Sequence, residues 1–199
     1  MRNRGLSLLV LPLLAGVCLA QPAWATTYAI DADHSTASFK IRHLFSKVQG
    51  TFNDFTGTFN YEPEHPEQWS AEATIQAASI DTDVPKRDDH LRSADFFDVA
   101  KYPTLTFKST EVTDATPAGA TLHGLLTLHG VEQPVVLDLA IHGEGKDPWG
   151  NQRSGFTATT TINRKDFGLT WNQALETGGV LVGDDVEIIL EIEGIVKTP

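Results

Sequence analysis

The chain has 199 residues, with 15 Lys and Arg against 26 Asp and Glu, so its formal net charge is −11 at pH 7. This acidity argues against nucleic acid or an anionic membrane surface as a general partner. The single cysteine, Cys18, excludes an intramolecular disulfide and a metal site built from several cysteines.

Residues 1–25 have the features of a secretory signal peptide. Two arginines within the first four residues precede an apolar run over residues 6–14, and the sequence Ala-Trp-Ala ending at Ala25 has the small-x-small pattern of a cleavage site. The apolar run is shorter than the roughly 20 residues that a membrane-spanning helix needs. We therefore predict export to the periplasm with cleavage after Ala25, which also removes Cys18.

Residues 26–199 then form the mature protein, and 174 residues are enough for one domain with its own core. Cleavage removes two of the 15 basic residues and no acidic residue, which leaves 13 basic against 26 acidic residues and a net charge of −13. This range shows no linker, repeat or low-complexity tract, so we predict a single domain.

Apolar and polar residues alternate with a period of two in about eight segments, which is typical of β-strands with one buried face. The buried positions are expected at Ala37, Phe39, Ile41 and His43; Phe55, Gly57, Phe59 and Tyr61; Ala71, Ala73, Ile75 and Ala77; Leu105 and Phe107; Leu122, Gly124, Leu126 and Leu128; Val135, Leu137, Leu139 and Ile141; Phe156, Ala158, Thr160 and Ile162; and Val186, Ile188, Leu190 and Ile192. Short turns between the strands favour an antiparallel meander. The fold class predicted is all-β, an antiparallel eight-stranded barrel, although a sandwich would accommodate the same pattern.

Alanine and glycine recur at the inward positions, among them Gly57, Ala71, Ala73, Gly124 and Ala158. A solid core made of such small residues would bury little area per residue. Small walls opposed by large aromatic residues can instead enclose a cavity, and eight strands leave room for one small ligand. Ordinary packing of large side chains against small ones is the alternative that this pattern leaves open.

A barrel embedded in the outer membrane is a further alternative for an exported β-protein. Its strands would be about 9–11 residues long, with an apolar outer face and aromatic girdles at both interfaces. The predicted strands are mostly shorter and lack paired girdles. We therefore predict a soluble barrel that is not membrane-embedded.

The charged and aromatic stretch from residue 80 to residue 107 interrupts the strand pattern. Between residues 83 and 97 we predict a short helical segment, because Asp83 can cap a helix and Pro85 suits its first turn. Ser93 can cap a second turn, which carries two phenylalanines. One interpretation is a crossover whose aromatic side chains plug an end of the barrel; the other is a gate whose charges meet the polar end of a ligand.

The sequence contains no recognisable catalytic or metal-binding motif. Ligand types are abundant, but none has a spacing such as His-Glu-x-x-His; they are His34, His43, His90, His123, His129 and His142, with Asp31 and Asp33. Ser35 directly follows His34, and neighbours on a strand point to opposite faces, so they cannot act as a pair. We predict no catalytic residue and no metal site. A metal-dependent hydrolase and a structural or interaction module remain as rival functions.

Short motifs that cover essentially all of the mature chain appear together, in a fixed order. They are Ile30-Asp31 with His34-Ser35, Gly50-Thr51-Phe52, Arg87-Asp88-Asp89-His90-Leu91, Asp95-Phe96-Phe97-Asp98, Tyr102-Pro103, Gly124-Leu125-Leu126-Thr127-Leu128-His129-Gly130-Val131, Ile162-Asn163-Arg164-Lys165-Asp166-Phe167-Gly168 and Val182-Gly183-Asp184. Any one motif is weak, but the ordered set resembles the YceI-like polyisoprenoid-binding family.

The resemblance implies a lipocalin-like barrel with a long apolar channel, usually in the periplasm. It also implies a long-chain isoprenoid or other amphiphilic lipid as ligand, such as a prenyl phosphate, an isoprenoid quinone or a quinone precursor, with no other cofactor. The family fixes no catalytic residues. A membrane quinone enzyme is a conceivable partner only through this resemblance, and the barrel is expected as a monomer or homodimer.

We combine the alternation and the resemblance into a predicted ligand site. The channel lining is expected to include Phe39, Ile41, Phe52, Phe59, Ile75, Phe107, Leu126, Ile162 and Ile188. The mouth is expected to include His43, Arg87, His90, Phe96 and Phe97, since these residues combine apolar rings with charge.

Overall fold

The computed structural model describes residues 25–176 and 178–197, so the predicted signal peptide, apart from Ala25, lies outside the described residues. The strands are β1 (Thr26–Ile30), β2 (Thr36–His43), β3 (Ser46–Phe52), β4 (Phe55–Tyr61), β5 (Ser70–Gln76), β6 (Ile80–Asp81), β7 (Thr104–Thr116), β8 (Gly119–Leu128), β9 (Val131–Lys146), β10 (Gln152–Asn163) and β11 (Val182–Val196). The helices are α1 (Pro85–Arg92) and the short 3-10 helices η1 (Ala32–His34), η2 (Pro66–Gln68), η3 (Ala77–Ser79) and η4 (Arg164–Phe167).

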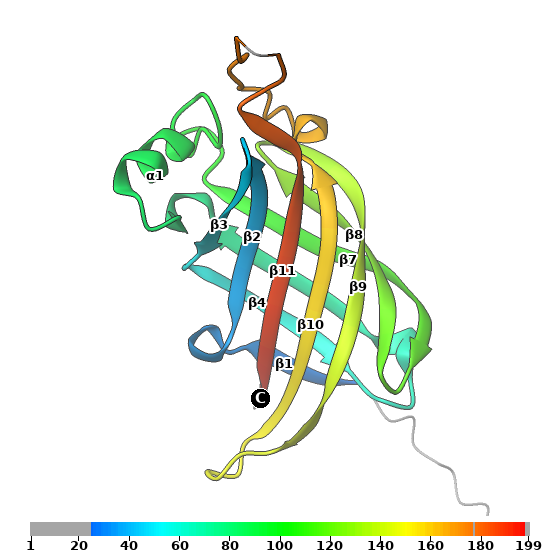
Figure 1. Cartoon of the computed structure of the whole chain (residues 1–199). Coiled ribbons are helices and arrows are strands. Elements are labelled where there is room, and N and C mark those ends of the chain that lie inside the picture. The colour runs from blue at the N-terminus through cyan, green and yellow to red at the C-terminus, as the bar shows by residue number, and fades with distance from the viewer. Residues whose placement is uncertain (1–24, 177, 198–199) are drawn as a thin grey trace, which may run out of the picture.

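Eight of these strands close into an antiparallel barrel in the order β1, β4, β5, β7, β8, β9, β10 and β11 (Figure 1). Pairing of Tyr28 in β1 with Val196 in β11 closes the ring. The predicted all-β barrel is therefore confirmed, and the sandwich alternative is wrong. Because β1 and β11 pair with each other, none of the eight strands has an unpaired edge at this seam.

Three strands that were not predicted, β1, β3 and β6, complete the sheet. β1 belongs to the ring in place of the predicted β2, which forms a hairpin with β3 and pairs with the other end of β11, and β6 adds two residue pairs to β3. β11 thus pairs with β1 near its carboxyl end and with β2 along Val182–Glu191. The hairpin extends the wall of the barrel toward the end that carries α1 (Figure 1).

The strands from β7 to β11 are 10 to 16 residues long, so the prediction of mostly shorter strands is wrong. Their ends pair through polar residues, for example Gln152 with Lys146 and Thr116 with Gly119. Backbone hydrogen bonds form whatever the side chains are, whereas alternation marks only the part of a strand that covers the interior. Glu187, Ile189 and Glu191 occupy outward positions of β11.

Small and large inward side chains alternate around the barrel wall. Leu139, Ala158, Leu190, Ala37 and Phe52 are register partners in turn across β9, β10, β11, β2 and β3. Paired residues of an antiparallel sheet share one face, so each alanine lies between two larger neighbours. This arrangement leaves space in front of the alanines without weakening the wall.

The predicted inward glycines have a different role from the alanines. A Cβ atom at Gly124 would lie 2.4 Å from the ring of Phe107, and one at Gly57 would lie 2.5 Å from the Glu72 carbonyl oxygen. Because glycine has no side chain, a neighbouring group can lie close to the backbone at these two positions. Large-against-small packing therefore explains Gly57 and Gly124, whereas Ala71, Ala73 and Ala158 line open space.

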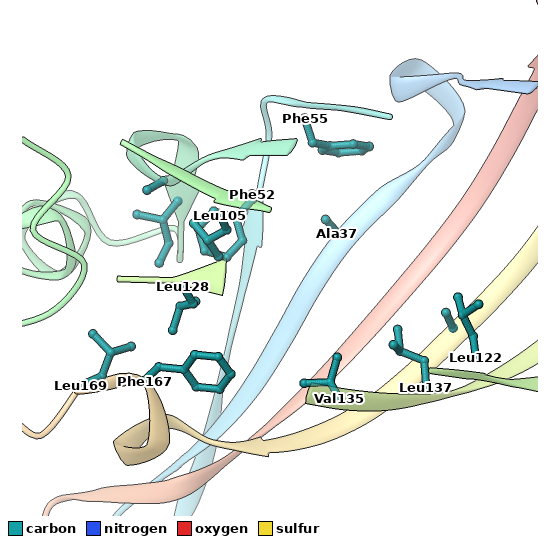
Figure 2. Close-up of a cluster of buried hydrophobic side chains, with 13 residues drawn as sticks. Ala37, Phe52, Phe55, Leu105, Leu122, Leu128, Val135, Leu137, Phe167 and Leu169 are labelled. Atoms are coloured by element: carbon teal, nitrogen blue, oxygen red, sulfur yellow. The ribbon is translucent and has the colours of Figure 1, made fainter. Parts of the chain in front are cut away.

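The main hydrophobic cluster joins the barrel wall to the segments at the α1 end. Figure 2 shows Phe52 of β3, Leu105 of β7, Leu128 of β8 and Phe167 of η4 drawn together from four separate elements. Phe167 is only 2% exposed. Through these contacts, η4 and the segment before α1 pack against the barrel.

The interruption of the strand pattern folds as α1 followed by turns. Pro85 occupies the first helical turn as predicted, but the predicted cap at Asp83 is wrong, since Val84 is the N-cap and Asp83 has a φ of 62°. Ser93 confirms the second turn, because its Oγ accepts from the Asp95 N–H at 3.3 Å. In the part of the chain that the structure describes, no helix is long and apolar enough to cross a membrane.

Candidate functional site: an apolar cavity in the barrel

The barrel encloses a cavity of about 450 Å³ whose lining is almost entirely apolar. Every residue predicted for the ligand site lines it; they are Phe39, Ile41, His43, Phe52, Phe59, Ile75, Arg87, His90, Phe96, Phe97, Phe107, Leu126, Ile162 and Ile188. The volume falls in the range of about 300–1,000 Å³ typical of small-molecule sites. The structure therefore brings these side chains around one space, and their contact with a ligand stays a prediction.

Aromatic side chains close the end of the cavity farther from α1, and we call this group the aromatic floor. Tyr28 stacks on Phe59 with ring centroids 5.0 Å apart, and Phe156 meets Phe59 and Tyr61 edge-on at 5.1 and 5.0 Å. All four rings are buried. Stacked and edge-on pairs of this kind add about 0.5–1.5 kcal/mol each beyond the area they bury, so the floor is a firm boundary.

Two of the four floor side chains, Tyr28 and Tyr61, have a hydroxyl group, and Tyr61 lines the cavity. The Tyr28 hydroxyl donates to Glu144 Oε2 at 3.2 Å. Burial and the neighbouring Glu144 carboxylate together raise the pKa of Tyr28 to about 12, and burial also raises the pKa of Tyr61. Both phenols therefore stay neutral at physiological pH, and this end suits an uncharged hydrocarbon.

Three aromatic rings form a cluster at the α1 end, which we call the mouth cluster. His90 of α1, Phe96 of the following turn and Trp171 of the segment after η4 lie with ring centroids 5.0 to 5.1 Å apart. Sequence analysis missed Trp171, because the segment after Phe167 has no regular period. The cluster joins the two irregular segments that cover this end of the barrel (Figure 1).

Two phenylalanines that the sequence places side by side have separate roles in the structure. Phe96 belongs to the mouth cluster and is buried, whereas Phe97 meets Phe52 of β3 edge-on with centroids 5.6 Å apart. Phe97 is half-buried and faces the cavity. The segment after α1 therefore contacts the cavity directly at Phe97.

The charged residues of α1 are largely held by local hydrogen bonds. Arg87 donates from Nε to Thr82 Oγ1 and from Nη2 to the Thr82 carbonyl, both at 2.7 Å. The buried carboxylate of Asp88 accepts from the Thr82 N–H at 2.9 Å and from its hydroxyl. His90 Nε2 lies 2.9 Å from Asp95 Oδ2. These groups position α1 and also place a guanidinium and an imidazole beside the cavity.

Arg164 of η4 is the most deeply buried cation near the cavity, and its anchoring role was not predicted. Its guanidinium is 3% exposed and donates to the carbonyl oxygens of Leu169, Trp171 and Gly183 at 2.5, 2.9 and 2.8 Å. It also lies 3.4 Å from Asp184 Oδ1. Burial lowers the pKa of Arg164, and the Asp184 carboxylate opposes that shift. Arg164 thus fixes the chain around Trp171.

Asp31, His34 and Glu193 are the one group in the described part of the chain whose ligand atoms could meet at a metal ion. Arg153 already occupies this group, since its Nη1 donates to Asp31 Oδ2 at 2.7 Å and to Glu193 Oε1 at 2.6 Å. Its Nε donates to Asp147 Oδ2 at 2.9 Å and holds the pKa of that carboxyl well below its usual range. A guanidinium and a metal cation compete for the same oxygens. None of these residues lines the cavity.

Comparisons with known proteins agree with this architecture. The model of the YceI-like domain matches residues 28–194. A UPF0312 protein of Ectopseudomonas mendocina is 44% identical over 188 residues, covering 92% of this chain and 94% of its own. The crystal structure of the Campylobacter jejuni YCEI protein has a TM-score of 0.69 at 31% identity, over 79% of this chain and 90% of that one.

A more distant solved structure has the same fold. It is a polyisoprenoid binding domain from Saccharophagus degradans, implicated in plant cell wall breakdown, with a TM-score of 0.64 at 16% identity. The match covers 86% of this chain and 99% of that one. From the barrel, the extent of the domain match and the identity to its relatives, we conclude that this chain belongs to the YceI-like family.

Proposed function

We propose that the protein binds a long-chain isoprenoid-type lipid in the barrel cavity, for storage or transport in the periplasm, and catalyses no reaction itself. The observation that carries this proposal is an almost entirely apolar cavity that ends at the aromatic floor and has the guanidinium of Arg87 and the imidazole of His90 at the opposite, α1 end. The Saccharophagus degradans domain, named for polyisoprenoid binding, supports the same ligand class.

The energetics favour a hydrocarbon chain as the ligand. Each buried CH₂ group contributes about 0.8 kcal/mol, before the cost of ordering the chain is subtracted. A long isoprenoid gains this contribution many times over, and the gain depends on length more than on the headgroup. We therefore expect the cavity to accept several related lipids, because a hydrophobic pocket discriminates weakly between them.

The two ends of the cavity suggest how such a lipid lies. The hydrocarbon tail points toward the aromatic floor, where the phenol of Tyr28 is neutral. The polar end, such as a phosphate or a quinone ring, lies at the α1 end near Arg87 and His90, which line the cavity there. His43, at the end of β2, lies on the same lining. This orientation favours the gate interpretation of the segment around α1.

Both rival functions find less support. A metal-dependent hydrolase would need its His and Asp ligands at a substrate site. Asp31 and Glu193 instead bind Arg153, His34 contacts Asp31, and all three lie away from the cavity. A structural module would have a filled interior, because protein cores pack at the density of organic crystals. An apolar cavity of about 450 Å³ is a large departure from such packing.

Native mass spectrometry of the protein purified from its own source tests the proposal. We expect an added mass that organic solvent extracts, present in near-stoichiometric amount and identifiable as one or a few isoprenoid-type lipids. An empty barrel that also fails to take up added lipid would contradict the proposal. A bound metal whose removal abolishes a hydrolytic activity would favour the enzyme instead.

Replacing Phe97 by alanine is expected to accelerate release of bound lipid without unfolding the protein. Phe97 faces the cavity and is only half-buried, so its loss opens a path while costing less than the roughly 3–5 kcal/mol of a fully buried phenylalanine. Release of a fluorescent lipid and the free energy of unfolding are measured on the same variant. Phe167→Ala is the control, since Phe167 is buried and does not line the cavity. If Phe97→Ala releases the lipid at the wild-type rate but loses most of its free energy of unfolding, the segment after α1 is a plug and not a gate.

A further inference from the structure

Exposed apolar side chains gather at the end of the barrel that carries α1. Phe45, at the tip of the β2–β3 hairpin, is fully exposed. Val84, which precedes α1, and Val180, which precedes β11, are also exposed. Figure 1 places the hairpin tip, α1 and the segment before β11 at the same end of the molecule. Single exposed apolar residues are common, whereas three at one rim indicate a candidate contact surface.

The tip has a backbone that ordinarily selects glycine. Leu44 and Phe45 form a two-residue turn, and Leu44 has a φ of 50°. Two-residue hairpin turns favour Gly, Asn or Asp where φ is positive, and a bulky residue there is strained. Leu44 is held in place by its N–H, which donates to the Leu181 carbonyl at 2.9 Å. Because strain of this kind clusters at functional positions, an apolar Leu-Phe tip indicates a role for its side chains.

The tip is continuous with the lining of the cavity. His43, directly before the turn, Val48 on the returning strand and Leu181 beside Leu44 all line the cavity. Phe45 therefore extends the apolar surface of the interior outward past the rim. A lipid that enters or leaves at this end passes next to the tip.

The exposed area is too small for a stable protein partner. A phenylalanine ring buries roughly 150–250 Å², and two half-exposed valines add less than that again. A specific protein interface needs about 800 Å² on each side. A few apolar side chains that protrude from a rim suit the interfacial region of a bilayer, where aromatic rings are favoured.

The charges around this end neither attract nor repel strongly as a set. Lys47 pairs with Glu187, and Lys165 pairs with Asp184 at 2.9 Å. In α1, exposed Asp89 pairs with Arg92 at 3.3 Å, and exposed Lys86 lies three residues after exposed Asp83. Basic and acidic groups therefore balance locally, although the whole chain is acidic. Contact with a bilayer at this end would depend on apolar insertion and little on salt.

We propose that this end docks on a lipid bilayer, with Phe45 inserted at the interface and Val84 and Val180 beside it, so that the cavity opens toward the membrane. The inference rests on the proposed function, because a water-insoluble isoprenoid has to be exchanged with a lipid phase. The docked protein is peripheral, since only the rim enters the interfacial layer. The partner is the bilayer itself, and no second protein is required.

Flotation with phosphatidylcholine vesicles tests the proposal on the full chain as the cell processes it. Phe45→Ser is expected to weaken vesicle binding about tenfold, because one buried aromatic side chain is lost from the contact. Trp149→Ser is the matched control, since Trp149 is an exposed aromatic residue in the β9–β10 loop at the opposite end (Figure 1). This control is expected to bind like the wild type, as is the wild type in high salt.

Several results would overturn the docking proposal. One is equal vesicle binding by Phe45→Ser and the wild type. Another is a larger loss of vesicle binding in Trp149→Ser than in Phe45→Ser. A third is dissociation of the wild type from the vesicles in high salt. A change of oligomeric state in Phe45→Ser without vesicles would instead make the tip an interface between copies of this chain. Both variants alter exposed side chains, so folding should be retained.

A second arm separates docking from lipid binding. The isoprenoid alcohol geranylgeraniol is supplied from ethanol without vesicles, and we expect the wild type and Phe45→Ser to take it up equally. Extraction of the same alcohol from vesicles should be about tenfold slower in Phe45→Ser. If the wild type fails to take up the alcohol without vesicles, the proposed function is contradicted. If only Phe45→Ser loses this uptake, a role of Phe45 confined to docking is contradicted.

Discussion

Replacing Ala158 by phenylalanine is expected to abolish lipid binding while the barrel stays folded. Ala158 lines the cavity from β10, between Leu139 and Leu190, so the added ring projects into the space that the lipid tail would occupy. We expect the lipid-bound fraction in native mass spectrometry to fall at least tenfold. The free energy of unfolding should stay within about 1 kcal/mol of the wild type, because the ring enters a void and not a packed core.

Ala120→Phe is the matched control for this experiment. Ala120 and Ala158 are 7% and 6% exposed, but only Ala158 lines the cavity. An added ring at Ala120 overpacks the wall, which costs typically about 1–3 kcal/mol. Two equally destabilised variants would show that the interior is filled. A stable Ala158→Phe that still carries its lipid would place the ligand elsewhere.

Replacing Arg164 by methionine is expected to lower the free energy of unfolding by about 3–5 kcal/mol, the usual result of removing one partner from a buried ionic network. The substitution leaves the carbonyls of Leu169, Trp171 and Gly183 without their donor. Each buried carbonyl that loses its hydrogen bond costs about 1–3 kcal/mol. Chemical denaturation monitored by tryptophan fluorescence measures the change, and the spectrum also reports on Trp171.

Lys165→Met provides the comparison for Arg164. Lys165 is the next residue and pairs with the same Asp184 at 2.9 Å, but its side chain is 47% exposed. Exposed pairs contribute about 0–1 kcal/mol, so this variant should remain close to the wild type. If both variants lose the same stability, the ion pair with Asp184 matters and the carbonyl anchor does not. Arg164→Lys is not expected to restore the free energy of unfolding, because an ammonium cannot reproduce the planar fork of donors.

The barrel and most of its lining could be predicted because alternation fixes the inward face of a strand. Within residues 37–43 of β2, 156–162 of β10 and 186–192 of β11 the period of two continues without interruption, so Phe39, Ile162 and Ile188 had to share the interior once the ring closed. The family resemblance then favoured a cavity over a packed core. Residues on regular strands were therefore accessible from the sequence.

The features that were missed lie where no period exists or where tertiary contacts override local preference. Trp171 and the anchoring role of Arg164 depend on a loop whose path is set by hydrogen bonds to distant carbonyls. The strand β3 reads as polar, and it forms because β2 and β6 pair with it on both sides. Asp83 resembles a helix cap, but its φ is 62° and Val84 occupies the N-cap position.

The closing seam of the barrel has a consequence for how the chain folds. The seam joins Tyr28 to Val196 and Ile30 to Gly194, which lie near opposite ends of the described part of the chain. Contacts between residues so distant raise the contact order, and proteins dominated by such contacts fold slowly. The ring cannot close until Val196 has been synthesised, so every shorter nascent chain has open strand edges and an exposed apolar interior. We therefore expect chains that lack β11 to aggregate more readily than the complete protein.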